Sequence, residues 1–460
     1  MKSFLCTCVA VCALFSGAAS GFAAENPPTP TALNLDDCIR MALKAAPELG
    51  EAQSDIALAT SKLDEAKSYR FPQLQVTTLV GPAPVARQDA IVPQIKTNEM
   101  LFSTNSLTWF TSADATVIQP LYTFGKISEN MTAATHGIEV DRSRKEQRTN
   151  EIVLKVHEYY NGLLLAREMK ELVLEVEDIL IRAREKAQKL MDQGSETVDQ
   201  MDLYKLDAFS GMATKYLEEA KKGEALALAA LRARMNLPVD APLEIGIDRL
   251  TVIDAEISPV EVYIEQARRK RPEMRQIDEG LKARTALIEA AKANYYPDIF
   301  LGGLFSWAYS DDRDRIRNPY ITDQFNHMNG GVALGARWKL DFGITGAKVA
   351  AERAQYNRLL STKEYADANI PLQVEKYYLD MVEGKKSAQA TRTAYLNAKK
   401  WAVTAVANFD FGMGPAKDIF EALQAYSSMR SDFFRSVYNY RIAEANLEYA
   451  TNNTSHIHDK

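Results

Sequence analysis

Apolar and polar residues alternate along this chain with two different periods. Over residues 35–69 the apolar positions recur at the spacing of one amphipathic helix, and Pro72 ends that pattern. Over residues 332–342 apolar and polar residues alternate strictly, which predicts a strand with one apolar face. Residues 299–309 alternate less cleanly and predict a second strand just before it. The pattern therefore predicts that helix gives way to a pair of strands.

A weaker alternation over residues 74–80 and 118–124 predicts a matching pair of strands in the first half. Each pair is followed by a long stretch without helix breakers, residues 126–191 and 345–409. Pro371 is the exception, and it should kink or locally break the second helix. At 1.5 Å per residue such helices would extend roughly 95 Å, a length typical of coiled-coil-like packing.

The two halves also repeat each other in sequence. Short motifs return at nearly constant spacing: Pro47-Glu48 and Pro72 recur 225 residues later as Pro272-Glu273 and Pro297, and Phe124-Gly125 recurs 218 residues later as Phe342-Gly343. The change of offset places a seven-residue length difference between the paired strands, where a loop accommodates it most easily. We predict two repeats, residues 25–243 and 244–453, each ordered helix, strand, strand, long helix, helix.

The N-terminus has the organisation of a secretory signal peptide. Lys2 supplies positive charge, residues 4–15 are apolar, and small residues continue to Ala24. We therefore assign residues 1–24 to a cleaved signal, with a buried N-terminal helix as the alternative. Three of the four cysteines would leave with this peptide, so the mature chain would keep only Cys38 and could form no internal disulfide.

Composition narrows the possible functions. The formal charge is −6, or −7 without Lys2, and this mild acidity argues against nucleic-acid binding. No nucleophile-base motif, phosphate-binding loop or metal-spaced histidine and cysteine cluster is present, so we predict a non-enzyme without cofactor or metal. His456 and His458 lie in the polar tail, residues 454–460, where disorder is expected rather than metal binding.

The strands have the length and pattern of outer-membrane barrel strands. Aromatic residues near strand ends suit the two membrane interfaces: Trp109, Tyr122, Trp307 and Tyr309. Four strands cannot close a barrel in lipid, where an open sheet edge is costly. Three chains would supply twelve strands with closed symmetry. The alternative is a soluble four-stranded sheet packed on helices.

The chain resembles the TolC family of outer membrane efflux proteins along nearly its whole mature length. The local motifs that carry the resemblance are the run Leu35 to Leu43 with Pro47-Glu48-Leu49, and Gln119-Pro120-Leu121-Tyr122 before Phe124-Gly125. The resemblance implies a homotrimer whose twelve-stranded barrel sits in outer-membrane lipid. It also implies a helical tunnel through the periplasm that docks an adaptor protein and an inner-membrane transporter.

Family members place two acidic residues at the closed tunnel entrance, and the turn at Gly412 leads to such a pair. Asp418 and Glu421 lie three residues apart, so they share one helix face and would form two carboxylate rings in a trimer. The corresponding residues of the first copy are Gln200 and Leu203, so a ring would come from the second copy alone. Alternatively, both acids simply favour the first turn of a helix.

Gly194, Gly412 and Gly414 mark the two predicted tip turns, where the resemblance implies adaptor docking. Glycine also ends ordinary helices, and the two interpretations are compatible. The preferred function is the exit duct of an efflux system for small molecules or ions. A duct for one-step polypeptide secretion has the same architecture, and a periplasmic coiled-coil scaffold without membrane contact is the alternative from another class.

Overall fold

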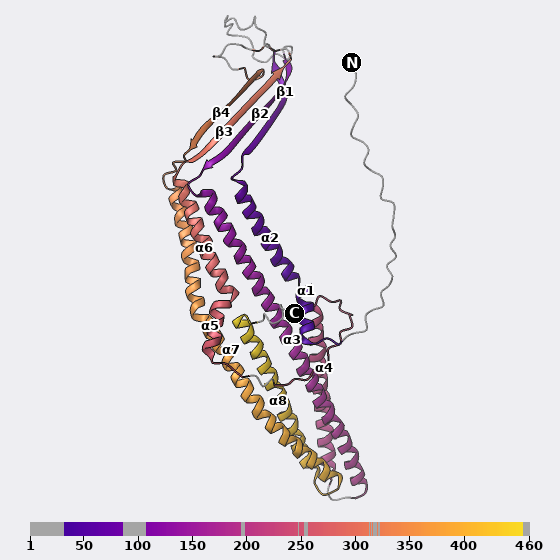
Figure 1. Cartoon of the computed structure of the whole chain (residues 1–460). Helices are drawn as coiled ribbons and strands as arrows, with labels where there is room; N and C mark the ends of the chain where they lie inside the picture. Colours follow the sequence, from indigo (N-terminus) through magenta and orange to yellow (C-terminus); the bar gives the residue numbers. More distant parts are fainter. Residues whose placement is uncertain are drawn as a thin grey trace.

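A computed structural model describes residues 32–85, 107–194, 198–246, 248–252, 256–311, 313, 315, 320 and 323–453. The predicted signal peptide and polar tail lie outside these residues. The described part is elongated, with a β-sheet at one end and two helical turns at the other (Figure 1). Long helices connect the two ends, and the last helix, α8, ends near the middle of the molecule (Figure 1).

The same order of helices and strands occurs in both halves. The first half contains α1 (Leu35–Ala45), α2 (Pro47–Ser68), β1 (Gln73–Pro84), β2 (Leu107–Tyr122), α3 (Lys126–Asp192) and α4 (Gln200–Arg234). The second half contains α5 (Val260–Lys270), α6 (Pro272–Lys292), the single 3₁₀ turn η3 (Ala293–Tyr295), β3 (Asp298–Ser310), β4 (His327–Arg337), α7 (Ile344–Asp410) and α8 (Ala416–Thr451). This order agrees with the predicted succession of elements.

The prediction of one helix over residues 35–69 was wrong, because the chain breaks between α1 and α2. Ala46 is extended, with ψ 116°, and Pro47 begins the second helix. Proline disfavours helical geometry in the residue before it and suits the first position of a new helix. Arg271 and Pro272 separate α5 from α6 in the same way.

Both long helices were predicted to within one residue of their ends. Each contains 67 residues and so extends roughly 100 Å. The expected break at Pro371 is absent, since α7 is helical on both sides of this residue. α7 does change direction along its length (Figure 1), which is compatible with a bend.

A repeated Phe-Gly turn leads from each sheet hairpin into its long helix. Phe124 and Phe342 have φ 48° and 45°, and the glycines that follow have φ 94° and 138°. Glycine reaches such left-handed geometry without the Cβ penalty of other residues. The pair identified in the sequence is therefore a conformational requirement of the sharp turn between strand and helix.

The four strands form one antiparallel sheet in the order β1-β2-β3-β4. Register puts an almost wholly apolar set of residues on one face: Leu74, Val76, Val80, Val117, Phe305, Trp307, Val332 and Leu334. The other face carries mainly polar residues, here termed the polar face: Gln75, Thr77, Asp114, Thr116, Ser306 and Asn329. Leu79 and Leu304 are exceptions on the polar face. The sheet is thus amphipathic, and most of its apolar side chains are exposed in the single chain.

The strand predicted over residues 332–342 was placed too far along the chain. β4 ends at Arg337, which pairs with Asp298 at the start of β3. The residues before Asp298 form a 3₁₀ turn and offer no partner, although the alternation continues through Leu340. Alternation alone therefore does not locate the end of a strand, since pairing also needs a neighbour.

The helices pack as two hairpins, α3 with α4 and α7 with α8, which contact each other along α3 and α8. Three apolar clusters fill these contacts, one of which lies near the tip turns and another around α1 and the middle of α3. Gly384 of α7 allows close approach to α8, because a Cβ there would lie 2.9 Å from the Cα of Tyr440. The hairpins are thus joined into one helical wall.

Candidate functional site

The two helical turns lie side by side at the end of the molecule farthest from the sheet (Figure 1). α3 ends at Asp192 and α7 at Asp410, and Gly194 and Gly412 follow with φ 74° and 72°. These two glycines adopt the left-handed geometry that commonly ends a helix. Gly414 does not have positive φ, but a Cβ there would lie only 3.3 Å from the Cβ of Asn408.

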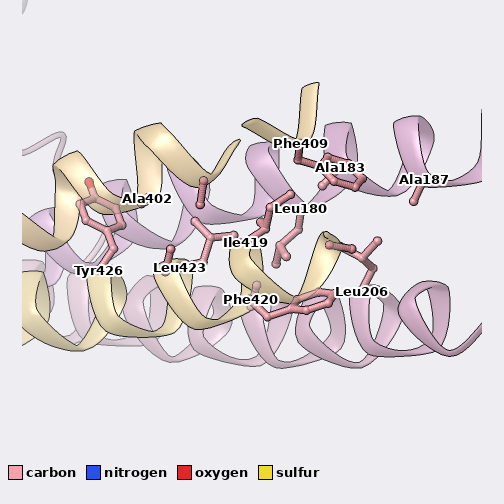
Figure 2. Close-up of a cluster of buried hydrophobic side chains, with 14 of the residues drawn as sticks. Leu180, Ala183, Ala187, Leu206, Ala402, Phe409, Ile419, Phe420, Leu423 and Tyr426 are labelled. Atoms are coloured by element: carbon pink, nitrogen blue, oxygen red, sulfur yellow. The ribbon is translucent and has the colours of Figure 1, made fainter. Parts of the chain in front are cut away.

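An apolar core lies directly beside the turns and fixes how α8 is presented. Figure 2 shows side chains from all four helices converging there: Leu180, Ala183 and Ala187 of α3, Leu206 of α4, Ala402 and Phe409 of α7, and Ile419, Phe420 and Leu423 of α8. The Phe420 ring also stacks on Phe209 of α4, with centroids 5.3 Å apart. The first turns of α8 are therefore anchored by one buried face.

Asp418 and Glu421 lie on the other face of this helix and are both exposed in the single chain. They alternate with the buried Ile419 and Ala422, which confirms the predicted common face. The Lys417 ammonium lies 3.5 Å from the Glu421 carboxylate, one helical turn away. Lys417 thus partly offsets the charge of one acid and leaves Asp418 as the freer carboxylate of the pair.

The first-copy counterparts of this acidic pair differ from the predicted Gln200 and Leu203. Leu203 is buried, and its burial matches Phe420 rather than Glu421. The buried series of α4 recurs on α8 after 217 residues: Leu203, Leu206, Ala213, Leu217 and Ala220 match Phe420, Leu423, Arg430, Phe434 and Val437. The structural counterparts of Asp418 and Glu421 are therefore Met201 and Tyr204, both exposed. The acidic pair still belongs to the second copy alone.

A buried ionic cluster, not identified in the sequence, joins α8 to α3 above the tip core. The Arg430 guanidinium donates hydrogen bonds to the Glu175 carboxylate and to the Tyr426 hydroxyl, the latter at 2.9 Å. Tyr426 in turn donates to Glu175 at 2.9 Å. Two more carboxylates of α3, Glu168 and Glu171, approach Arg430 at 3.9 and 4.0 Å. One cation therefore faces three acids.

Burial raises the pKa of Glu168, and the neighbouring Glu171 charge adds to this shift although Arg430 opposes it. Glu168 Oε2 has no hydrogen-bond partner among the described residues. The sequence held a signal for this cluster, since Arg430 occupies a position of the buried stripe of α8. Glu168, Glu171 and Glu175 occur at helical spacing on one face of α3.

Comparison with protein families gives one match that covers most of the chain. The model of the family described as outer membrane efflux protein matches residues 38–203 and 263–453. The chain belongs to the outer membrane efflux protein family. This confirms the predicted family and, with it, the outer membrane as the location of the protein. No curated protein sequence matches the chain.

Solved structures of outer-membrane channels share the fold of this family member at low sequence identity. The Campylobacter jejuni CmeC outer membrane channel is 15% identical with a TM-score of 0.74, covering 91% of this chain and 85% of that one. CusC, described in connection with transmembrane channel formation, is 15% identical with a TM-score of 0.73, covering 94% and 95%. The open state of the Neisseria gonorrhoeae MtrE channel is 15% identical with a TM-score of 0.72, covering 91% and 88%.

Two observations on the described residues complete the description of this family member. Among them, no helix combines the length and apolar character needed to cross a membrane. The same part of the chain contains no group of three or more histidine, cysteine, aspartate or glutamate side chains arranged to hold a metal ion.

Proposed function

We propose that this protein is the outer-membrane exit duct of a tripartite efflux system, acting as a homotrimer. Three copies of the sheet would close a twelve-stranded barrel in lipid, and the helical hairpins would form a tunnel through the periplasm. A periplasmic adaptor would dock at the turns around Gly194, Gly412 and Gly414, with an inner-membrane transporter behind it. The duct would pass small molecules or ions.

The amphipathic sheet is the observation that carries this proposal. Its apolar face exposes Val80, Val332 and Leu334, each more than 70% accessible in the single chain. Water would disfavour that face, whereas lipid favours it. β1 and β4 each have one neighbour in the described chain, and unpaired strand edges cost several kcal/mol per backbone group in lipid. Closure with other copies satisfies both requirements.

The exposed acidic pair supports a selective entrance at the opposite end. In a trimer, Asp418 and Glu421 would each occur three times around the axis. Rings of carboxylates attract cations and resist close approach to one another. We therefore expect this entrance to be narrow, cation-attracting and sensitive to divalent ions.

Planar-bilayer recording tests the proposed duct and its entrance together. Replacing both acids, Asp418→Ala with Glu421→Ala, should raise single-channel conductance and weaken block by divalent cations. Lys417→Ala is the matched control, because it removes the partner of Glu421 and keeps both acids. It should strengthen divalent block. Unchanged conductance and block in all three variants would rule out the acidic entrance, and failure of the purified wild type to conduct would contradict the duct itself.

A further inference from the structure

Part of the polar face of the sheet is covered at the end away from the helices. Ser112, Ala308 and Ser310 belong to this face and are buried, with accessibilities of 7%, 2% and 1%. Their neighbours on the apolar face, Trp109 and Tyr309, are 71% and 50% accessible. The cover comes from residues between β3 and β4, chiefly Arg313 and the segment 323–327, here termed the strap.

Several contacts fix the strap to the sheet. The Arg313 guanidinium donates to both carboxylate oxygens of Asp323 at 2.7 and 2.9 Å, and to the Pro84 carbonyl at 2.5 Å. The Asp323 side chain is 1% accessible. Phe325 packs edge to face on Phe110, a residue of the polar face, with ring centroids 5.0 Å apart. The strap is thus built into the polar face rather than extended beyond the sheet.

A chain of hydrogen bonds continues from the strap across β4, β3 and β2. His327 Nδ1 lies 2.7 Å from the Asp323 carbonyl oxygen, and His327 Nε2 lies 2.6 Å from Ser306 Oγ. Ser306 Oγ lies 2.5 Å from Asp114 Oδ1. Polar groups of one strap residue and three strands therefore form a continuous row.

Counting donors decides how many protons this row holds. The Asp323 carbonyl can only accept, so His327 Nδ1 must donate to it. The hydroxyl of Ser306 has one hydrogen, which serves either Asp114 or His327 but not both. If Asp114 is ionised, Ser306 donates to it and His327 Nε2 must also carry a proton. If His327 is neutral, Asp114 must carry the proton instead.

Either arrangement holds one proton more than an ionised aspartate with a neutral histidine. When that proton leaves to hydroxide, at least one of the three hydrogen bonds is lost and two acceptors face each other. The other groups facing this row carry no unbalanced charge. Thr77 of β1 pairs with Asp114, and in the strap Arg313 is paired with the Asp323 carboxylate.

We propose that one proton shared between Asp114 and His327 latches the strap onto the polar face. Protonated, the row holds the strap over the sheet; deprotonated, the strap loosens. If the polar face lines the lumen, as the proposed function has it, the latch narrows the outer exit of the duct at low pH and widens it at high pH.

Hydrogen exchange on the purified full-length protein tests the latch without requiring channel activity. The Phe325 amide donates to Asp323 Oδ1 at 3.0 Å and reports on the strap. Rates are compared with those of His327→Gln at about pH 5.5 and about pH 8, on either side of ordinary histidine titration, so that intrinsic exchange cancels. We expect wild-type protection relative to this variant to fall about tenfold between the two pH values. An equal ratio at both would overturn the latch.

Two further variants keep the test decisive if His327→Gln does not fold. Asp114→Asn supplies both a donor and an acceptor, so the row needs no extra proton and the strap should stay protected at both pH values. His136→Gln alters a histidine of α3 paired with Glu279, and its pH response should equal that of the wild type. Protection of Asp114→Asn that falls as in the wild type would refute the latch.

Bilayer recordings separate this inference from the proposed function. Wild-type conductance should be larger at about pH 8 than at about pH 5.5, and Asp114→Asn should remove the difference. If the exchange result holds but no preparation conducts, the latch stands and the duct fails. If the protein conducts while exchange ratios ignore pH, the duct stands and the latch fails.

Discussion

At the scale of single residues, Arg430 has the largest predicted effect on stability. Its guanidinium faces Glu168, Glu171 and Glu175 of α3 within 4.0 Å, and its side chain is 9% accessible. Arg430→Met would leave buried carboxylates without a cation, which typically costs about 3–5 kcal/mol. Denaturant unfolding in detergent should show a loss of about that size.

Arg182→Met is the control for this substitution. Arg182 pairs with Asp178 on the surface of α3, and both side chains are about two thirds accessible. Exposed pairs contribute about 0–1 kcal/mol, so this variant should unfold almost as the wild type does. Equal losses in the two variants would show that the Arg430 cluster has no special role in joining α8 to α3.

Glu448 near the end of α8 gives a pH-dependent prediction. Burial raises the pKa of this carboxyl to about 7, and the charge of Glu444 adds to the effect. The folded protein therefore binds the proton more tightly than the unfolded chain, and stability falls as pH rises from about 4.5 to about 7. Glu448→Gln should stabilise by about 1–3 kcal/mol at about pH 8 and hardly at about pH 4.5.

Unfolding measured at both pH values checks the Glu448 prediction. Glu139→Gln serves as control, because the Glu139 side chain is 45% accessible and its replacement should matter little at either pH. A gain for Glu448→Gln that is the same at both pH values would contradict the assignment of this residue as a buried acid.

At the scale of elements, the contact between α7 and α8 depends on the missing side chain of Gly384. An added Cβ would lie 2.9 Å from Tyr440 Cα and 3.1 Å from its nitrogen, both backbone atoms that cannot rotate away. Gly384→Ala should therefore push the two helices apart and cost about 1–3 kcal/mol, measured by thermal unfolding in detergent.

Gly137→Ala is the matched control in the other long helix. A Cβ at Gly137 would meet nothing within 4 Å in the chain. Alanine there should stabilise α3 by about 0.5–1 kcal/mol through helix propensity alone. Stabilisation by both substitutions would show that α7 and α8 do not approach as closely as described.

The sequence predicted elements well where local signals decide their ends. Both long helices lack breakers and stop before the glycine turns, so their bounds were correct within one residue. The sequence failed where distant partners decide. β4 ends where β3 stops offering hydrogen bonds, and Arg430 pairs with Glu175, which is 255 residues away. The exposed face shared by Asp418 and Glu421 was predictable, but the one-residue difference between the two tip turns was not.

At the scale of the whole molecule, the two ends have opposite surface chemistry. The sheet exposes an apolar face, whereas the tip exposes an acidic pair above a buried core. The helical hairpins hold these ends far apart along one elongated wall (Figure 1). A single chain leaves both the apolar face and two strand edges without partners in the described part. The architecture therefore favours an assembly in which identical chains complete each other.

The central claim is that this family member works as a membrane-inserted trimer. Its most direct test is membrane fractionation followed by mass measurement of the detergent-solubilised protein. The account predicts recovery in the outer-membrane fraction, dependence on detergent, and a protein mass roughly three times that of one chain. A monomer released into the soluble fraction after cell lysis would contradict the account and favour a periplasmic scaffold.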